Sequence, residues 1–380
     1  MKIGILTLPL HTNYGGILQA WALQTVLERM GHEVKVLNRN KKISINWFIY
    51  PLKIIKRIVW RYIFNEKKTP IIYELKKNEE RSIKEKYTSE FVKKYINSLY
   101  YRTVKDLENL NFEAIVVGSD QVWSHEHARN ICGSVINAFL PFTKGKQMKR
   151  ISYAASFGKD YWEYTVEETT QCKEYIKSFE SVSVREESAI SLCKQYLGVD
   201  AICHLDPTLL LNAEDYMKLL SIHEVSKSKG NLLLYIIDKT EDKMHIADSI
   251  SSNLHLKPFE VNSRAEDTSG TIYTLEQKIQ PPVEQWLRGF YDADYVVTDS
   301  FHACVFSILF QKPFVVIGNK QRGLARFESL LEKLNLESHL IDGYAQLTPS
   351  LIQSPIEWNE VSNRLDLLRM ESMNYLKQNL

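Results

Sequence analysis

KIGILTLPLHTNYGGILQAWALQTVLERMGHEVKVL, residues 2–37, is the stretch that decides the fold. Residues 2–8 form a short apolar run with the length of a buried parallel strand. The glycine pair that follows predicts a tight turn, and residues 17–30 carry apolar side chains at helical spacing. Residues 32–37 predict a second strand. The stretch therefore predicts a βαβ unit whose first turn lies where parallel sheets bind ligands, at the carboxyl end of a strand.

The alternation of strands and helices continues along the chain. Further strands are expected at residues 112–118, 150–155, 181–184, 201–205, 231–237, 293–298 and 313–317. Helices are expected after Val166 and Glu186, and at residues 242–253, 301–310, 324–334 and 356–380. Strands that alternate with helices predict an α/β fold, with parallel sheets covered on both faces.

This pattern divides into two Rossmann-like domains that face each other across a cleft. Residues 1–208 form the first domain, and residues 41–97 within it break the alternation and are interpreted as a helical insertion. Residues 209–350 form the second domain, and residues 351–380 form a terminal helix that packs back on the first. A chain of 380 residues is long for one core and sufficient for two.

Composition narrows the class of function. The formal net charge is +2, too small to imply a nucleic-acid partner. The five cysteines are scattered and odd in number, which fits a reducing compartment. The first residues lack the features of a signal peptide, and no stretch is apolar enough to span a bilayer, so a cytoplasmic location is expected. The His and Asp residues lack the close spacing of a metal site, and no metal is expected.

Two polar clusters follow predicted strands of the first domain. Asn13-Tyr14-Gly15-Gly16, with Gln19, offers glycines for close backbone approach and a helix N-terminus that attracts anions. The alternative is an ordinary tight turn between strand and helix. Ser119-Asp120 ends a run of small and apolar residues, and Asp120 is suited to orient or deprotonate a sugar hydroxyl. The alternative is an aspartate that caps the next helix.

Three cationic candidates follow later strands. Arg185 ends a strand and is placed to clamp a phosphate or carboxylate, unless it pairs with a neighbouring glutamate. His302 lies in the first turn of a helix that Asp299 or Ser300 can cap, where a bound phosphate would have an imidazole beside it. Its alternative is a structural histidine in a capped helix. Arg326, which opens another helix, adds a second cation or belongs to a solvated face.

A basic and aromatic stripe occupies residues 52–64 of the insertion. Lys53, Lys56, Arg57 and Arg61 fall on one helical face, and apolar or aromatic residues fill the rest. This pattern suits peripheral contact with a membrane surface that carries anionic lipids. The alternative is a helix that packs on the domain with its lysines in solvent.

Taken together, these motifs resemble the polysaccharide pyruvyl transferase family over nearly the whole chain. The residues that carry the resemblance are Gly4-Ile-Leu-Thr7, Asn13-Tyr-Gly-Gly-Ile-Leu-Gln-Ala20, Gly118-Ser-Asp-Gln-Val-Trp123, Ser152-Tyr-Ala-Ala-Ser-Phe-Gly158, Ser183-Val-Arg-Glu186, Leu205-Asp-Pro-Thr208, Thr298-Asp-Ser-Phe-His302, Pro313-Phe-Val-Val-Ile317 and Arg326. The order and spacing of the set carry the resemblance, since each motif alone is unspecific.

The resemblance implies a fold like that of GT-B glycosyltransferases. It implies that the chain transfers the enolpyruvyl unit of phosphoenolpyruvate to a sugar of a surface polysaccharide, such as a capsule or exopolysaccharide, or to its lipid-linked precursor. The product would be a pyruvate ketal that bridges two hydroxyls. Phosphoenolpyruvate and a glycan are the expected partners, and no cofactor beyond this donor is expected.

The resemblance also implies roles for single residues. Arg185 would clamp the donor, His302 would protonate its methylene carbon or bind its phosphate, and Asp120 would bind or activate the acceptor. Arg326 would assist the departing phosphate. The residues expected in the loops and on the acceptor side are Asn13, Tyr14, Gly15, Gly16, Gln19 and Ser119.

One position departs from the family. Its members place an arginine two residues before the histidine, and this chain has Ser300 there, within the expected donor site. Arg326, Lys312 or Arg322 would have to supply the missing cation. Two other functions therefore stay open: a GT-B glycosyltransferase that uses a nucleotide sugar, and a non-catalytic subunit of polysaccharide assembly. A late ribose-binding glutamate would favour the first, and none is evident.

Overall fold

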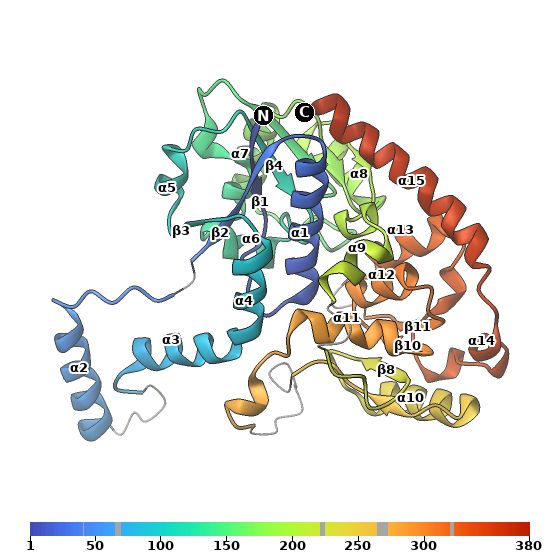
Figure 1. Cartoon of the computed structure of the whole chain (residues 1–380). Helices are drawn as coiled ribbons and strands as arrows, with labels where there is room; N and C mark the ends of the chain where they lie inside the picture. The colour runs from blue at the N-terminus through green and yellow to red at the C-terminus, as the bar shows by residue number, and fades with distance from the viewer. Residues whose placement is uncertain (41, 65–69, 221–224, 264–272, 320–322) are drawn as a thin grey trace.

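The chain folds into two α/β halves, each built on a five-stranded parallel sheet (Figure 1). The computed structural model describes residues 1–40, 42–64, 70–220, 225–263, 273–319 and 323–380. Among these residues, no helix combines the length and the apolar character needed to cross a membrane.

The first sheet has the strand order β3-β2-β1-β4-β5. Its strands, in that order, are Ser98–Tyr101, Glu33–Arg39, Lys2–Leu6, Ala114–Gly118 and Lys149–Tyr153. All pairs are parallel, and β1 lies at the centre with Ile3 opposite Val34 on one side and Ala114 on the other. A short parallel pair, β6 (Ser183–Val184) and β7 (Ile202–Cys203), continues beside β5 through isolated bridges.

Helices cover both faces of this sheet. They are α1 (Tyr14–Arg29), α5 (Val104–Glu108), α6 (His125–Cys132), α7 (Val166–Ile176) and α8 (Ser188–Leu192). Along β1, Ile3 and Ile5 point into the cluster that contains α1, whereas Leu6 joins the cluster on the opposite face. Because both faces are covered, the strand reads as an apolar run without alternation.

The second sheet has the order β12-β11-β10-β8-β9 and is also parallel. Its strands, in that order, are Leu340–Ile341, Phe314–Ile317, Tyr295–Thr298, Leu232–Tyr235 and Pro258–Phe259. Its helices are α9 (Ala213–Leu219), α10 (Glu241–Leu254), α11 (Val283–Asp292), α12 (Phe301–Leu309), α13 (Ala325–Lys333) and α14 (Pro349–Gln353). The sequence did not predict α11 or the short strands β3, β9 and β12.

The two halves share a hydrophobic core on their facing sides. One cluster joins Ile17 of α1 to Trp286 of α11 and Phe306 of α12. Tyr14 stacks on Trp286 with 5.3 Å between ring centroids, and its hydroxyl donates to the carbonyl of Pro281 at 2.7 Å. The terminal helix α15 (Trp358–Asn379) runs back to the first half (Figure 1), where the Tyr375 hydroxyl donates to the Ser152 carbonyl at 2.9 Å.

The insertion forms three helices, α2 (Tyr50–Ile63), α3 (Tyr73–Lys84) and α4 (Lys86–Tyr95). Helices α3 and α4 lie against the body, where the amide of Gln280 in the second half donates to the Lys84 carbonyl at 3.0 Å. Helix α2, by contrast, projects away from the rest of the molecule (Figure 1).

The prediction of a tight turn at the glycine pair Gly15-Gly16 is wrong. Helix α1 begins at Tyr14, so both glycines lie in its first turn, and the Asn13 side chain caps it by accepting from the Gly16 amide at 3.2 Å. Neither glycine has the positive φ that a glycine turn would require. The physical reason for Gly15 is steric and lies in the second half of the molecule.

Candidate active site

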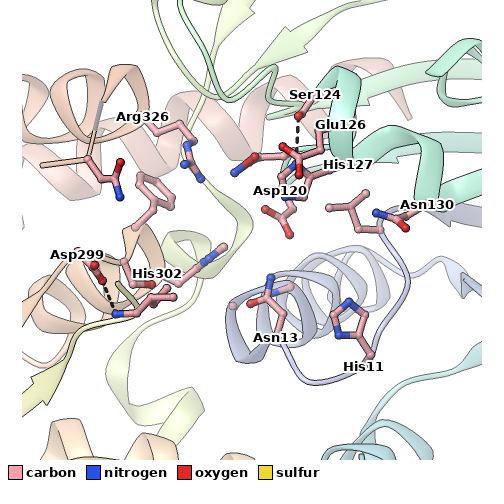
Figure 2. Close-up of a pocket in the computed structure, with 18 of the residues that line it drawn as sticks. His11, Asn13, Asp120, Ser124, Glu126, His127, Asn130, Asp299, His302 and Arg326 are labelled. Atoms are coloured by element: carbon pink, nitrogen blue, oxygen red, sulfur yellow. Dashed lines mark hydrogen bonds between the residues drawn. The ribbon is translucent and has the colours of Figure 1, made fainter. Parts of the chain in front are cut away.

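A cavity of about 590 Å³ lies between the two halves, at the carboxyl ends of both sheets (Figure 2). The first half lines it with the segments after β1 and β4 and with α6, and the second half with the segments after β8 and β10 and with α13. Its volume falls within the range of about 300–1,000 Å³ that is usual for small-molecule sites.

The N-termini of α1 and α12 meet at this cavity. A Cβ atom at position 15 would overlap the imidazole ring of His302, so only glycine lets the two helices approach this closely. His302 lies in the first turn of α12, and Gly15 in the first turn of α1. The histidine of one domain therefore rests on the backbone of the other.

The first turn of α12 is open toward the cavity. Ser300 holds the N-cap position without a side-chain cap, and no described residue supplies one. Asp299 is turned away, since it accepts from the amides of Ile237 at 2.7 Å and Asp238 at 3.0 Å and from Lys243 Nζ at 2.6 Å. The expected cap by Asp299 or Ser300 is thus wrong, and the free amides of the helix can meet an anion.

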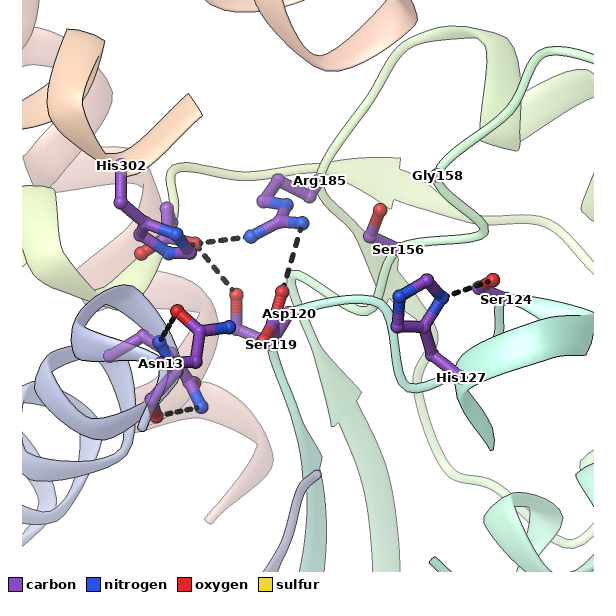
Figure 3. A network of polar contacts seen from close by, with 12 residues as sticks. Asn13, Ser119, Asp120, Ser124, His127, Ser156, Gly158, Arg185 and His302 are labelled. Atoms are coloured by element: carbon purple, nitrogen blue, oxygen red, sulfur yellow. Dashed lines mark hydrogen bonds and ion pairs between the residues drawn. The ribbon is translucent and has the colours of Figure 1, made fainter. Parts of the chain in front are cut away.

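A cluster of buried charges lies beneath the cavity (Figure 3). The Arg185 side chain is only 1% exposed, and its Nη1 donates to Asp206 Oδ2 at 2.7 Å. Its Nη2 lies 3.7 Å from Asp120 Oδ1. Asp206 also accepts from Ser119 Oγ at 3.0 Å. Buried charges of this kind are tolerated only when they are paired. Arg185 is paired with Asp206 and Asp120, although its Nε and Nη2 form no hydrogen bond with a described residue.

Asp206 is the centre of this cluster, and its role was not inferred from the sequence. Its Oδ1 accepts from the amide and hydroxyl of Thr208 at 3.0 and 2.7 Å, and its Oδ2 lies 3.6 Å from His302 Nε2. Burial would raise the pKa of Asp206, but His302 and Arg185 hold the pKa of this carboxyl far below its usual range. Asp206 is therefore a fixed negative charge under His302.

Asp120 and His302 both line the cavity, and each has a buried polar atom without a hydrogen-bond partner among the described residues. These atoms are Asp120 Oδ2 and His302 Nε2, and the second lies 3.6 Å from Asp206 Oδ2. Asp120 has a φ of 59°, a left-handed conformation that is uncommon for aspartate and occurs at functional sites. It does not cap α6, whose N-cap is Ser124. Asp120 and His302 come from opposite domains, and a ligand in the cavity could meet both.

Arg326 brings a second cation to the wall of the cavity. Two guanidinium groups contact the Phe301 ring, with the Arg185 Cζ at 4.7 Å and the Arg326 Cζ at 5.6 Å from its centroid. The side-chain amide oxygen of Gln121, in the orientation that satisfies both groups, accepts from Arg326 Nη1 at 2.9 Å. Arg326 thus stands on the same side of the cavity as His302 (Figure 2).

The opposite side of the cavity is polar and was largely missed from the sequence. Glu126, His127 and Asn130 of α6 line it, together with His11 (Figure 2). The Oγ of Ser124 lies 3.2 Å from His127 Nδ1. The spacing of Glu126, His127 and Asn130 places them on one helical face, which could have revealed them had α6 been predicted.

Some of the residues expected at the site line the cavity, and the others lie behind the lining and support it. Asn13, Gly15, Gly16, Asp120, Ser300, His302 and Arg326 line the cavity. Arg185 and Ser119 lie beneath it. Tyr14 joins the domains, and Gln19 is buried, with its Nε2 donating to Thr7 Oγ1 at 2.9 Å.

The structure also tests the residues that were expected to replace the missing arginine at position 300. Lys312 precedes β11, at the far end of the sheet, and its Nζ donates to the Tyr291 carbonyl at 2.9 Å, so it cannot serve the cavity. Arg322 lies outside the described residues. Within the described part of the chain, no group of three or more His, Cys, Asp or Glu side chains could hold a metal ion.

The fold has known counterparts among solved structures. UGT89C1 from Arabidopsis thaliana superposes with a TM-score of 0.50 at 8% identity, over 99% of this chain and 98% of that chain. AviGT4, a glycosyltransferase involved in avilamycin A biosynthesis, superposes with a TM-score of 0.47 at 11% identity, over 100% of this chain and 97% of that chain. UDP-N-acetylglucosamine 2-epimerase from Rickettsia bellii superposes with a TM-score of 0.45 at 11% identity, over 100% of this chain and 99% of that chain. No curated protein matches the sequence.

The two facing domains and the cavity between them define a GT-B-like protein, as the sequence predicted. The family model for polysaccharide pyruvyl transferase matches residues 13–321, most of the chain. The chain therefore belongs to the polysaccharide pyruvyl transferase family, a family of transferases.

Proposed function

We propose that the chain transfers the enolpyruvyl unit of phosphoenolpyruvate to a sugar of a surface polysaccharide or its lipid-linked precursor, with formation of a pyruvate ketal. One observation carries the proposal. Asp120 and His302, each with a buried polar atom that has no hydrogen-bond partner among the described residues, line one cavity from opposite domains. A base and an acid in this arrangement suit addition of an alcohol to the double bond of an enol phosphate ester.

The donor would bind on the side of the second domain. Phosphoenolpyruvate carries a phosphate and a carboxylate, and the uncapped N-terminus of α12 and Arg326 offer amides and a guanidinium to them. Ser300 leaves space where other family members carry an arginine, and Arg326 supplies the charge from α13. Arg185 serves as a positioning residue, because its guanidinium holds Asp206, which in turn faces His302.

The transfer follows from these positions. His302 donates a proton to the methylene carbon, and the neighbouring carbon becomes electrophilic. A sugar hydroxyl attacks this carbon and loses its proton to Asp120. The C–O bond to phosphate breaks with release of inorganic phosphate, and a second hydroxyl closes the ketal as its proton leaves with the phosphate. Asp206, whose Oδ2 lies 3.6 Å from His302 Nε2, keeps a negative charge beside the ring throughout the transfer.

The acceptor would occupy the opposite side of the cavity. There α6 and the segment after β1 present carboxylate, imidazole and amide groups, which are suited to hydrogen-bond sugar hydroxyls. Asp120 lies between this side and His302 (Figure 2), which is where the attacking hydroxyl must be. Asn13, which caps α1, borders the same space.

Calorimetric titration of phosphoenolpyruvate tests the donor. The wild type should bind it saturably, and Arg326→Gln should bind about 10- to 100-fold more weakly, since hydrogen bonds to charged groups contribute about 1.5–3 kcal/mol. Arg364→Gln is the matched control, because Arg364 pairs with Glu360 on the exposed surface of α15. Its affinity should equal that of the wild type.

Two results would overturn the proposal. One is a wild type that binds a nucleotide sugar but not phosphoenolpyruvate. The other is a wild type that binds phosphoenolpyruvate yet releases no phosphate with any acceptor from a panel of galactosides, N-acetylmannosaminides and their lipid-linked forms. Phosphate release that His302→Ala abolishes, with its thermal unfolding unchanged, would support the assigned acid.

A further inference from the structure

Helix α2 and the residues before it expose most of the large hydrophobic side chains that are exposed in the described part of the chain. More than half of those side chains lie between Ile43 and Phe64. Ile55 is 57% exposed, Val59 39% and Ile63 70%. Scattered exposed hydrophobic residues are normal, but a contiguous apolar surface on a projecting helix marks an interaction site.

Most of the exposed hydrophobic residues of α2 lie on one half of the helix. At about 100° per residue, one arc of about 180° collects only apolar and tyrosine side chains. This apolar face of α2 consists of Leu52, Ile55, Ile58, Val59, Tyr62 and Ile63. The other half carries the four basic residues of the helix, and Trp60 and Phe64 lie beside them.

The structure separates the four basic residues into two pairs. Arg57 donates to both carboxylate oxygens of Glu74 at 2.6 and 2.8 Å, and Lys53 lies 3.6 Å from the same carboxylate. The hydrogen bonds from Arg57 lower the pKa of Glu74 to about 2, so this carboxylate stays charged and ties α2 to α3. Lys56, whose Nζ lies 5.7 Å from the Trp60 ring centre, and Arg61 are not part of this contact.

The positive charge of this segment favours a lipid surface over a second copy of this chain as the partner of α2. Residues 43–64 contain four basic side chains and no acidic one. A second copy docked through the same apolar face would bring Lys56 and Arg61 of both copies to one interface without a carboxylate from either α2. Anionic headgroups supply the missing negative charge, and tryptophan, tyrosine and phenylalanine are suited to the level of the headgroups.

We propose that α2 is an interfacial helix that seats this protein on a membrane with anionic lipids. Its apolar face enters the boundary between headgroups and acyl chains, while Lys56 and Arg61 meet the headgroup phosphates. With 14 residues the helix is about 21 Å long, shorter than the ~30 Å hydrocarbon core, so it lies in the plane of the surface. The pair of Arg57 and Glu74 ties the helix to α3, and α2 projects from the rest of the molecule in Figure 1.

Flotation of the full chain with vesicles tests this proposal without any substrate. Vesicles of phosphatidylcholine alone and of phosphatidylcholine with phosphatidylglycerol are compared. The wild type should float with the anionic vesicles. Ile55→Asn/Val59→Asn/Ile63→Asn should lose more than about 100-fold in partitioning, because three apolar side chains no longer leave water. Lys56→Gln/Arg61→Gln should lose roughly 30-fold, from ~1 kcal/mol per charge and 1.4 kcal/mol per tenfold change.

The matched control carries the same chemistry on other exposed surfaces. Val166→Asn/Leu367→Asn/Met370→Asn replaces three exposed apolar residues of α7 and α15 and should float like the wild type. A wild type that floats no better with anionic than with neutral vesicles would refute the charge contribution. An apolar-face variant that binds vesicles like the wild type, or that changes only the oligomeric state in light scattering, would overturn the membrane proposal and leave the donor titration unaffected.

Discussion

The floor of the cavity and helix α2 depart from the usual distribution of polar and apolar groups in opposite directions. Under the cavity, Arg185 and Asp206 are buried charges. On α2, isoleucines and a valine lie in water. A buried ion costs several kcal/mol unless it is paired, and exposed apolar surface forgoes ~25 cal/mol for each Å². Both arrangements reduce the stability of the free chain, and each lies where we propose that a ligand binds.

The comparison teaches how differently the two sites are held. The charges under the cavity are fixed by contacts from three separate segments, so nearly any change there should propagate to His302. The apolar face of α2 is positioned from the opposite face of the helix, where Arg57 donates to Glu74 and to the Ile71 carbonyl. Substitutions in the cavity floor should therefore affect both stability and catalysis, whereas those on the apolar face should leave both unchanged.

The largest effect is expected at Gly15. A methyl group there would displace the imidazole of His302, so Gly15→Ala should lower kcat by about 10²- to 10⁴-fold, the range of a lost general acid. Steady-state phosphate release measures this. Gly145→Asn is the control, since no atom lies within 4 Å of a Cβ at that site and asparagine tolerates its φ of 79°. Near-normal kcat in Gly15→Ala would contradict the proposed role of His302.

The next effect concerns stability. Asp206→Asn leaves Arg185 buried beside a neutral partner and should lower the free energy of unfolding by about 3–5 kcal/mol in urea titrations near pH 7. Asp200→Asn, which breaks an exposed pair with Lys194, should change it by less than about 1 kcal/mol. Equal values for the two variants would mean that the buried cluster carries no special weight.

The pH dependence of this difference has a defined sign. The folded-state pKa of Asp206 is depressed, so its contribution to stability is complete above the unfolded-state value of about 4 and is lost as the pH falls through lower values. The difference in the free energy of unfolding between the wild type and Asp206→Asn should therefore decrease below about pH 4. A gap that widens in acid would contradict the charged state assigned to Asp206.

A smaller effect, on donor affinity, is expected when an arginine is placed at position 300, where this chain departs from its family. In the Arg326→Gln background, Ser300→Arg should restore donor affinity by about tenfold, because it returns one cation to the N-terminus of α12. Ser300→Gln supplies length without charge and should restore none. If both substitutions act alike in calorimetry, the donor site does not depend on the cation at this corner.

The smallest effect is expected on α2. Ile55→Asn and Ile63→Asn should each change the free energy of unfolding by no more than about 0.5 kcal/mol, because both side chains are already mostly exposed to water. Val116→Asn in β4, fully buried, should destabilise by several kcal/mol. Thermal unfolding of the three variants makes this comparison. A large loss for Ile55→Asn would place that side chain in a core.

Local patterns were sufficient for the central strands of both sheets and for part of the site, but not for the short edge strands β3, β9 and β12. The apolar runs ahead of Asp120 and His302 placed both residues at the carboxyl ends of strands, and both line the cavity. Gly15 was misjudged because its requirement comes from His302, which lies 287 positions along the chain. The role of Asp206 was missed for the same reason, since its partners Ser119, Arg185 and His302 belong to distant segments.

Helix α2 shows the same limit on the surface. Its amphipathic pattern could be read from spacing, and the basic residues do share one half of the helix. The sequence could not show that Arg57 and Lys53 both form ion pairs with Glu74, because Glu74 lies on another helix. Sequence periodicity specifies which face a side chain takes, but the partner that meets this face comes only from tertiary packing.

The contact between Gly15 and His302 ties the proposed chemistry to the packing of the two domains. The imidazole rests on a helix of the other domain, and both helices belong to the hydrophobic core that the two halves share. Neither half alone could therefore hold the proposed proton donor in place. If His302 is the acid, the two halves form one catalytic unit, and their interface is under the same constraint as the residues that line the cavity.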